Sequence, residues 1–250
     1  MTERVRWINA GNVGPFTFDG TRTYLVGARN LVVIDPGPDV HIHVRALFVA
    51  AAGADDVRVV LTHGHPDHAA AARPLADRLD AEVLGPELPG IVDRVLNDGE
   101  MVTTDHGDLI ALHTPGHTED HLCFHWPAEH ALFAGDLLLG QGDTTWVAEY
   151  PGCVADYFAS LERIRQLDLH VIYPAHGPPL EDPAEAIERF ERHRRERVRQ
   201  VEEALATLSS EDVHDLLDRV YGDTVPSGLE GAALRSLGAL VDYVKGVRRS

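Results

Sequence analysis

Four side chains that commonly bind metal ions lie within six positions of one another in the first third of the chain. The sequence there reads Thr-His-Gly-His-Pro-Asp-His and contains His63, His65, Asp67 and His68. Side chains alternate between faces along an extended segment, so His63 and His65 project to the same side. Pro66 halts the extended path and places Asp67 and His68 at the start of a helix. This spacing indicates a metal site at a strand-to-helix corner.

Three further residues of the same chemistry each follow or end an apolar run. His117 lies in a Thr-Pro-Gly-His-Thr turn, Asp136 ends a Leu-Phe-Ala-Gly run, and His176 comes shortly after Val-Ile-Tyr. Because α/β proteins often gather functional side chains at one edge of the sheet layer, we expect all seven to meet there. Five imidazoles and two carboxylates suit Zn²⁺, or less selectively Mn²⁺ or Fe. Seven ligands are too many for one tetrahedral zinc ion, so the sequence predicts two metal ions.

Short apolar strands must position these residues. The pattern of apolar runs and turn residues predicts strands at 31–35, 57–61, 81–84, 109–112, 122–126, 131–134 and 171–173. One helix is expected to begin near Ala69 and another to run from about Val154 to Leu167. Clustered strands with helices between them predict a layered α/β (α+β) fold with mixed sheets.

The character of the sequence changes near residue 180. Strand signals end there, and Pro183 suits a first helical turn with Asp182 as its N-cap. Further helices are expected at 212–221 and 229–244. We therefore expect a catalytic domain over residues 1–180 and a small helical domain over 181–250. The second domain could complete the substrate cleft, mediate a homodimer or only cap the core.

Composition excludes several classes of protein. The chain has 40 acidic and 22 basic residues, a net charge of -18, which repels polyanions and excludes a general nucleic-acid-coating role. It does not exclude an enzyme that cuts nucleic acid in one locally positive or metal-charged cleft. Cys123 and Cys153 have neither zinc-ligand spacing nor the density of a disulfide scaffold, which indicates buried thiols. The sequence shows no signal peptide or long apolar run, so we expect a cytoplasmic protein without a membrane span.

The stretch from Arg189 to Arg199 holds six arginines, interrupted by Glu191 and Glu196. One interpretation is a solvated helix face with ion pairs between neighbouring turns. The other is a patch that contacts phosphate groups. The sequence leaves both open, with the first favoured.

The pattern His-x-His-x-Asp-His, followed by the three later residues, resembles the metallo-β-lactamase superfamily over about Thr17 to Pro179. The resemblance implies an αββα sandwich with a dinuclear site at one edge. It assigns three histidines to the first metal: His63, His65 and His117. It assigns an aspartate and two histidines to the second metal: Asp67, His68 and His176. Asp136 would bridge the two metals.

Other segments resemble one branch of the superfamily, the lactamase-beta-like protein 2 group. The residues at 17–25, 34–38 and 173–178 are similar to motifs of that group, which also has a small winged-helix-like C-terminal domain. Two positions depart from its pattern, because Arg22 replaces an asparagine and Ala175 replaces a glycine. Neither change removes a metal ligand. Arg22 either contacts substrate or anchors a loop.

The resemblance implies a metal-dependent hydrolase. Two zinc ions about 3.5–4 Å apart can share a bridging hydroxide, because zinc lowers the pKa of bound water to about 7. Asp67 and Asp136 are the expected catalytic residues: Asp136 holds both metals together, and Asp67 orients the nucleophile or handles its proton. His121 is similar to a frequent family position, where it could orient a metal ligand.

The substrate is less well determined than the chemistry. The closest-looking group implies phosphodiester hydrolysis of single-stranded RNA, and the thioesterase and glyoxalase II-like branches imply an ester, thioester or lactone. Hydrolysis of β-lactams is disfavoured, since the β-lactamases lack a bridging aspartate at the position of Asp136. A mononuclear iron persulfide dioxygenase is disfavoured by the complete second-metal set. A metal-stabilised binding module without turnover is the remaining alternative.

Overall fold

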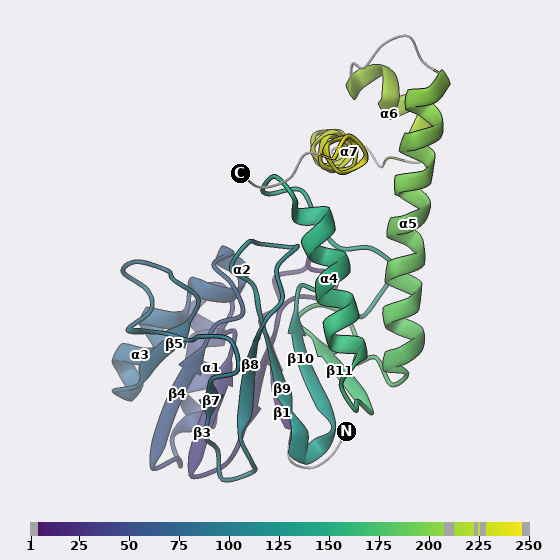
Figure 1. Ribbon diagram of the computed structural model, residues 1–250. Helices are drawn as coiled ribbons and strands as arrows, with labels where there is room; N and C mark the ends of the chain where they lie inside the picture. The colour runs from purple at the N-terminus through teal and green to yellow at the C-terminus, as the bar shows by residue number, and fades with distance from the viewer. Residues whose placement is uncertain (1–4, 208–212, 223–224, 226–228, 247–250) are drawn as a thin grey trace.

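Two β-sheets pack face to face and carry helices on their outer faces (Figure 1). The computed structural model describes residues 5–207, 213–222, 225 and 229–246. The first sheet has the order β1-β2-β3-β4-β5-β6, with bounds Val5–Asn9, Arg22–Val26, Asn30–Ile34, Asp56–Val60, Glu82–Gly85 and Arg94–Val95. The second has the order β11-β10-β9-β8-β7, and its strands β7 to β11 span Met101–Val102, Leu109–His113, Leu122–Trp126, Ala131–Gly135 and Val171–Pro174.

The helices form the two outer layers. Those of the first half of the chain are α1 His41–Ala51, α2 Pro66–Ala69 and α3 Ala72–Leu79. Those of the second half are α4 Cys153–Arg165, α5 Pro183–Thr207, α6 Val213–Tyr221 and α7 Glu230–Val244. A short 3-10 helix, Pro127–Glu129, joins β9 to β10. The αββα layering predicted from the resemblance is therefore confirmed.

Apolar side chains fill three layers of core. The central layer lies between the sheets and includes Tyr24, Ile34, Phe124 and Phe133, each no more than 2% exposed. A second cluster joins α1 and α3 to the first sheet. A third joins α4 and the C-terminal helices to the second sheet. Period-two alternation lets each sheet supply two of these layers from its opposite faces.

The predicted strands are all present within two residues of their expected bounds. The predicted N-cap of α5 is also confirmed, since the backbone N–H of Glu185 donates to Asp182 Oδ1 at 3.0 Å. The helix expected from Ala69 is broken, because α2 ends there and α3 begins at Ala72. Residue 212, the expected start of α6, lies outside the described residues. Cys123 and Cys153 are free and buried, as expected.

Several elements were not predicted. Strands β1 and β2 and helix α1 lack a distinct hydrophobic period, and strands β6 and β7 have two residues each, too few to show one. None of the described helices is both long and apolar enough to cross a membrane.

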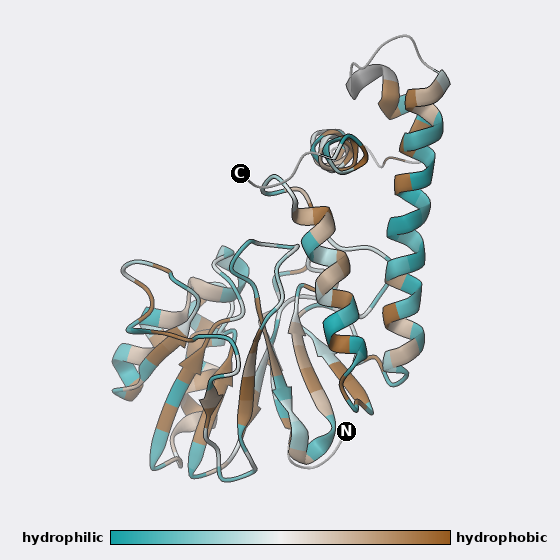
Figure 2. Cartoon of the chain, in the orientation of Figure 1, coloured by the Kyte–Doolittle hydropathy of each residue, from teal (hydrophilic) through white to brown (hydrophobic). Residues whose placement is uncertain are grey.

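The C-terminal helices share their core with the second sheet. Ile187 and Phe190 of α5 and Leu240 of α7 belong to the same buried cluster as Leu161 of α4 and Ile172 of β11. In Figure 2, α5 is mostly hydrophilic, with hydrophobic positions spaced along its length. The helix therefore covers apolar surface of the second half of the molecule with one face only.

Removing residues 181–250 should abolish cooperative unfolding of the remainder, because Leu161 and Ile172 would lose the side chains that cover them. Thermal unfolding followed by circular dichroism checks this. Arg192→Ala, a substitution at an exposed position of α5, should leave the melting temperature unchanged. A truncated chain that melts at the temperature of the full chain would contradict the shared core.

Candidate metal centre

All seven predicted ligands meet at one edge of the sandwich. His63 and His65 follow β4, while His117, Asp136 and His176 follow β8, β10 and β11. Strands β10 and β11 are parallel, and β8 runs in the same direction because β9 is antiparallel to both β8 and β10. Their carboxyl ends therefore share one edge. Side-chain atoms that could bind metal come within 4.8 Å of one another in three overlapping groups: His63, His65 and His117; His63, His68 and Asp136; Asp67, His68 and His176.

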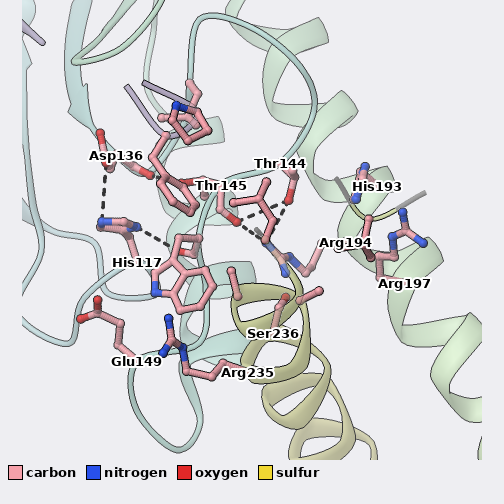
Figure 3. Close-up of a pocket in the computed structure, with 18 of the residues that line it drawn as sticks. His117, Asp136, Thr144, Thr145, Glu149, His193, Arg194, Arg197, Arg235 and Ser236 are labelled. Atoms are coloured by element: carbon pink, nitrogen blue, oxygen red, sulfur yellow. Dashed lines mark hydrogen bonds and ion pairs between the residues drawn. The ribbon is translucent and has the colours of Figure 1, made fainter. Parts of the chain in front are cut away.

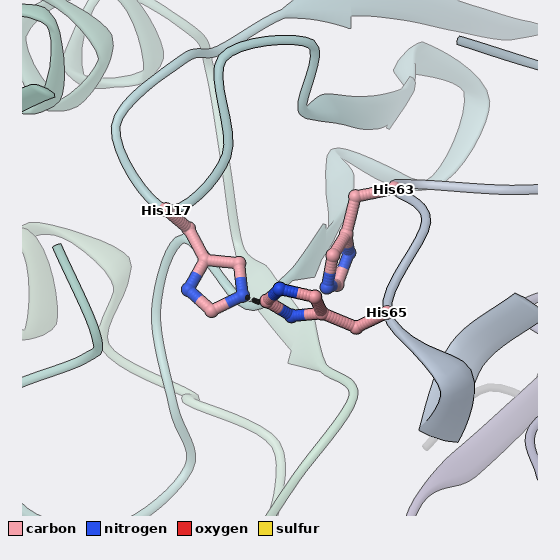
Figure 4. A group of neighbouring side chains, drawn as sticks. All are labelled: His63, His65 and His117. Carbon is pink, nitrogen blue, oxygen red and sulfur yellow. Dashed lines mark hydrogen bonds between the residues drawn. The ribbon is translucent and has the colours of Figure 1, made fainter. Parts of the chain in front are cut away.

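The first group is held together by contacts between its rings (Figure 4) and by two hydrogen bonds to residues outside the group. The ring centroid of His63 lies 4.6 Å from that of His65 and 4.8 Å from that of His117. His117 Nδ1 donates to the Trp146 carbonyl at 2.9 Å, and His65 Nε2 donates to Glu149 Oε1 at 2.7 Å. The remaining nitrogens, His117 Nε2 and His65 Nδ1, are 3.0 Å apart. Two lone pairs at this distance require a cation or an added proton between them.

His63 and His68 are oriented by the same buried aspartate. The Thr62 hydroxyl donates to Asp35 Oδ2 at 2.7 Å, so it accepts the hydrogen of His63 Nδ1 at 2.9 Å. His68 Nδ1 donates to Asp35 Oδ2 at 2.9 Å. When the rings are neutral, both Nε2 atoms are therefore acceptors that face the cluster, and both rings are fully buried. Asp35 thus fixes the tautomers of two candidate ligands.

Asp136 lies between two groups of candidate ligands. Its Oδ1 is 3.3 Å from His176 Nε2 and 3.5 Å from His68 Nε2. Its Oδ2 is 3.6 Å from His117 Nε2. Asp67 Oδ2 lies 3.3 Å from the same nitrogen of His176. Each oxygen of Asp136 therefore faces a different group, as a bridging carboxylate requires.

Three buried acceptors in this cluster have no hydrogen-bond partner: His63 Nε2, His68 Nε2 and Asp136 Oδ1. Leaving such atoms unsatisfied is costly, and native proteins rarely do so without an ion or water. Divalent metal ions would satisfy all three at once. The nitrogen and oxygen donors also match the preferences of zinc, manganese and iron, so the residues present fit such ions.

The charges of the cluster are strongly coupled. Burial opposes protonation of His68 and His176, but the carboxylate of Asp136 outweighs it and raises both pKa values, that of His176 to about 9. Burial also opposes ionisation of Asp136, yet these two histidines hold its pKa well below the usual range. Burial keeps the pKa of His63 low, so that ring stays neutral. The cluster thus attracts positive charge at its His68–His176 side.

His121 holds the backbone of Asp136. The Asp136 N–H donates to His121 Nε2 at 3.2 Å, and His121 Nδ1 donates to Thr114 Oγ1 at 3.0 Å. Gly135 has a φ of 49°, and a Cβ there would lie 2.7 Å from His121 Nε2. Only glycine lets β10 approach His121 this closely.

Sequence reasoning missed the loop between β10 and α4. Thr145 Oγ1 donates to the carbonyl of Asp136 at 2.7 Å, and the neighbouring Trp146 accepts from His117. Glu149 in the same loop binds His65. Arg194 of α5 holds this loop from behind through the Thr145 carbonyl at 2.7 Å. No sequence signal marks these residues, because their partners are distant along the chain and three of the four contacts use backbone carbonyls.

Arg22 is one of the two residues that depart from the pattern of the lactamase-beta-like protein 2 group, and it anchors a loop. It is 7% exposed, pairs with Asp19 at 2.6 Å and donates to the Gly177 carbonyl, while its backbone N–H donates to the Ala175 carbonyl at 2.8 Å. These contacts tie β2 to the turn that carries His176. Of the two roles left open by the sequence, the structure supports the anchoring one.

A cavity of about 580 Å³ opens from this cluster toward the C-terminal helices (Figure 3). His65, Asp67, His117 and Asp136 line one end. Apolar and aromatic side chains line the walls, among them Phe16, Phe18, Leu139, Trp146 and Tyr221. Residues of α5 and α7 close the other end, so the C-terminal helices complete the cleft.

The sequence model of one family matches most of the first 180 residues. The metallo-β-lactamase superfamily model matches residues 16–90 and 84–176, a span that holds every candidate ligand. The chain belongs to the metallo-β-lactamase superfamily. Membership makes it a hydrolase of a family whose members generally bind divalent metal ions, which agrees with the clusters described above.

Individual superfamily members extend the likeness to the C-terminal helices. The Beta-lactamase-like protein 2 homolog of Caenorhabditis elegans is 32% identical over 253 residues, covering 95% of this chain and 82% of that protein. The Atrochrysone carboxyl ACP thioesterase of Aspergillus chevalieri is 34% identical over 246 residues, covering 94% of this chain and 78% of that protein. The solved structure of TTHA1623 in a di-iron-bound form is 29% identical, covers 72% of this chain and 96% of that chain, and has a TM-score of 0.56.

Glu149→Gln should weaken zinc binding by about 10- to 100-fold, the usual effect of removing a carboxylate that orients a ligating histidine. The neutral amide would no longer strengthen His65 as a donor. Competition with a chromophoric chelator measures the affinity. Glu188→Gln, an exposed change on α5, serves as the matched control. Equal zinc affinity in Glu149→Gln and wild type would rule out this role.

Proposed function

We propose that this protein is a dinuclear zinc-dependent hydrolase that acts on thioesters or related carboxylic esters. The observation that carries the two-metal assignment is the position of Asp136, whose two oxygens face separate groups of histidines. One group would comprise His63, His65 and His117, and the other Asp67, His68 and His176. The solved structure of TTHA1623, which is 29% identical to this chain, is in a di-iron-bound form and supports the same count.

The chain's own residues can serve hydrolysis at this site. Bound divalent metal ions would lower the pKa of water and polarise the scissile carbonyl. Asp67 lines the cavity and keeps 30% of its side chain exposed. Burial opposes its ionisation, but His176 and His68 lower its pKa, so Asp67 is a carboxylate at neutral pH. It can therefore accept the proton of an attacking water, while Asp136 fixes the spacing of the two groups.

The cavity favours a small acyl substrate. Its volume lies in the range usual for small-molecule sites, and aromatic and aliphatic side chains form its walls. A superfamily member that matches 94% of this chain is named as an acyl carrier protein thioesterase. We infer that residues 181–250 form a second structural unit that shapes this substrate cleft.

Hydrolysis of single-stranded RNA is the second candidate. Arginines at the far end of the cavity favour a substrate that carries phosphate. The outward face of α5 does not, because its arginines pair with neighbouring glutamates: Arg189 with Glu185, Arg192 with Glu188, Arg195 with Glu191 and Arg199 with Glu196. This face is the ion-paired surface that the sequence favoured.

Zinc-loaded wild type should hydrolyse hexanoyl-coenzyme A, and Asp136→Asn should lose both this activity and bound zinc, because the two groups lose their shared carboxylate. Release of free thiol measures turnover, and metal analysis measures zinc. Asp77→Asn, an exposed change on α3, should behave as wild type.

A labelled single-stranded RNA oligonucleotide tests the second candidate in parallel. RNA cleavage by wild type but not by Asp136→Asn, without thioester hydrolysis, would overturn the thioester assignment and leave the metal centre standing. Full turnover and two zinc ions in Asp136→Asn would overturn the bridging role of Asp136.

A further inference from the structure

Three arginines reach the cavity from the C-terminal helices without a carboxylate partner. Arg194 and Arg197 belong to α5, and Arg235 belongs to α7. All three line the cavity that holds the candidate metal ligands at its other end (Figure 3). Among the described residues, no Asp or Glu forms an ion pair with any of them.

These arginines differ from the other four on α5. Each of those four forms an ion pair with a glutamate three or four residues away. The helix therefore neutralises the positive charge on its outer face and leaves it uncompensated on the face toward the cavity. In a chain with a net charge of -18, this local excess of positive charge is directed at what the cavity binds.

Arg194 provides buried positive charge. It is only 3% exposed, and its Nε is buried without a hydrogen-bond partner. Its Nη2 donates to the carbonyl of Thr145, and its guanidinium lies 5.5 Å from the ring centre of Tyr157. Burying a cation without an opposite charge is costly, and an anion nearby would offset that cost.

Arg197 and Arg235 are more accessible and are held by aromatic rings. The Arg197 guanidinium lies 4.6 Å from the ring centre of Tyr221, and that of Arg235 lies 5.1 Å from Trp146. Stacking of this kind orients a guanidinium without neutralising it. Arg197 also donates to the carbonyl of Val220 at 3.1 Å, which leaves nitrogens of both arginines available to a ligand.

The carboxylates nearby are engaged elsewhere. Asp143 pairs with His193 at 2.8 Å, and Glu149 binds His65 at the metal end. The cavity thus has two chemically distinct ends, one that attracts metal cations and one that attracts an anion. Trp146 lies between them, because its ring contacts Arg235 and its carbonyl accepts from His117.

We propose that Arg194, Arg197 and Arg235 form an anion subsite that binds a phosphate on the thiol half of the substrate. The proposal rests on the thioesterase function above. Acyl groups are commonly carried on a thiol arm that ends in a phosphate, which would place the phosphate at one end of the cavity and the thioester at the other. A phosphate offers several oxygens to guanidinium groups and keeps a negative charge both as a free monoester, about -1.5 to -2, and when it is joined to coenzyme A or a carrier protein, about -1 per phosphate, so it can bind more than one arginine.

Two thioesters with the same acyl group test the subsite. Hexanoyl-4'-phosphopantetheine carries the phosphate, and hexanoyl-N-acetylcysteamine lacks it. In the double variant Arg197→Gln, Arg235→Gln, KM for the first should rise by at least about tenfold, the loss of one charge-assisted contact, with kcat unchanged. KM for the second should not change. Arg192→Gln removes one charge from the outer face of α5 and should alter neither value.

Binding without turnover separates this proposal from the function on which it rests. Calorimetric titration of 4'-phosphopantetheine into zinc-free protein should show binding that the double variant weakens by at least about tenfold. Wild type could hydrolyse neither thioester and still bind 4'-phosphopantetheine at least about tenfold more tightly than the double variant does. In that case the thioesterase function fails and the subsite stands. Equal binding by wild type and double variant, or an equal rise in KM for both thioesters, would overturn the subsite.

The phosphate could belong to coenzyme A or to an acyl carrier protein. Hexanoyl-coenzyme A and a hexanoyl carrier protein share the arm and its phosphate, so the double variant should lose kcat/KM on both. The one with the higher kcat/KM on wild type identifies the source. If the double variant kept the kcat/KM of wild type on both substrates, the proposal would be overturned.

Discussion

The site depends on hydrogen bonds that fix the outward nitrogen of each buried histidine. Carboxylates, carbonyls and a hydroxyl accept from these nitrogens, as Asp35 does from His68 and Trp146 does from His117. When the rings are neutral, each inward nitrogen is then an acceptor that faces other acceptors. Such an arrangement is unfavourable unless positive charge occupies it, and the carboxylates of Asp67 and Asp136 add to the demand. The fold therefore supports a cluster that is stable only with protons or metal ions.

The rest of the structure brings the parts of that cluster together. Strand β4 of one sheet and strands β8, β10 and β11 of the other deliver ligands to one edge. Arg22 and Tyr24 of β2 bind the carbonyls of Gly177 and Pro174 across the two sheets, which fixes the turn that carries His176. Arg194 of α5 binds the loop that orients His65 and His117. Arginines of α5 and α7 line the end of the cavity that lies away from these histidines. The C-terminal helices thus contribute both to the support of the candidate ligands and to the cavity beside them.

The sequence predicted which side chains would gather at the sheet edge, because these candidate ligands carry their own signals. Metal-binding side chains at short spacing follow clear apolar strands, and His117, Asp136 and His176 repeat the same position after later strands. The residues around them were not predictable in this way. Glu149 is one acidic residue among 40, and Arg194 stands in a run of arginines of which four point outward. Only the packing of α5 and α7 against the loop before α4 distinguishes them.

The most direct test of the two-metal account is an anomalous diffraction map of zinc-soaked crystals, collected above and below the zinc absorption edge. The account predicts two peaks in contact with opposite oxygens of Asp136, one among His63, His65 and His117 and the other among Asp67, His68 and His176. A separate, largely exposed group of His130, Asp168 and His170 could also take up zinc, so crystals of His170→Gln should show the same two peaks. A single peak within the cluster, or two peaks that do not share Asp136, would contradict the account.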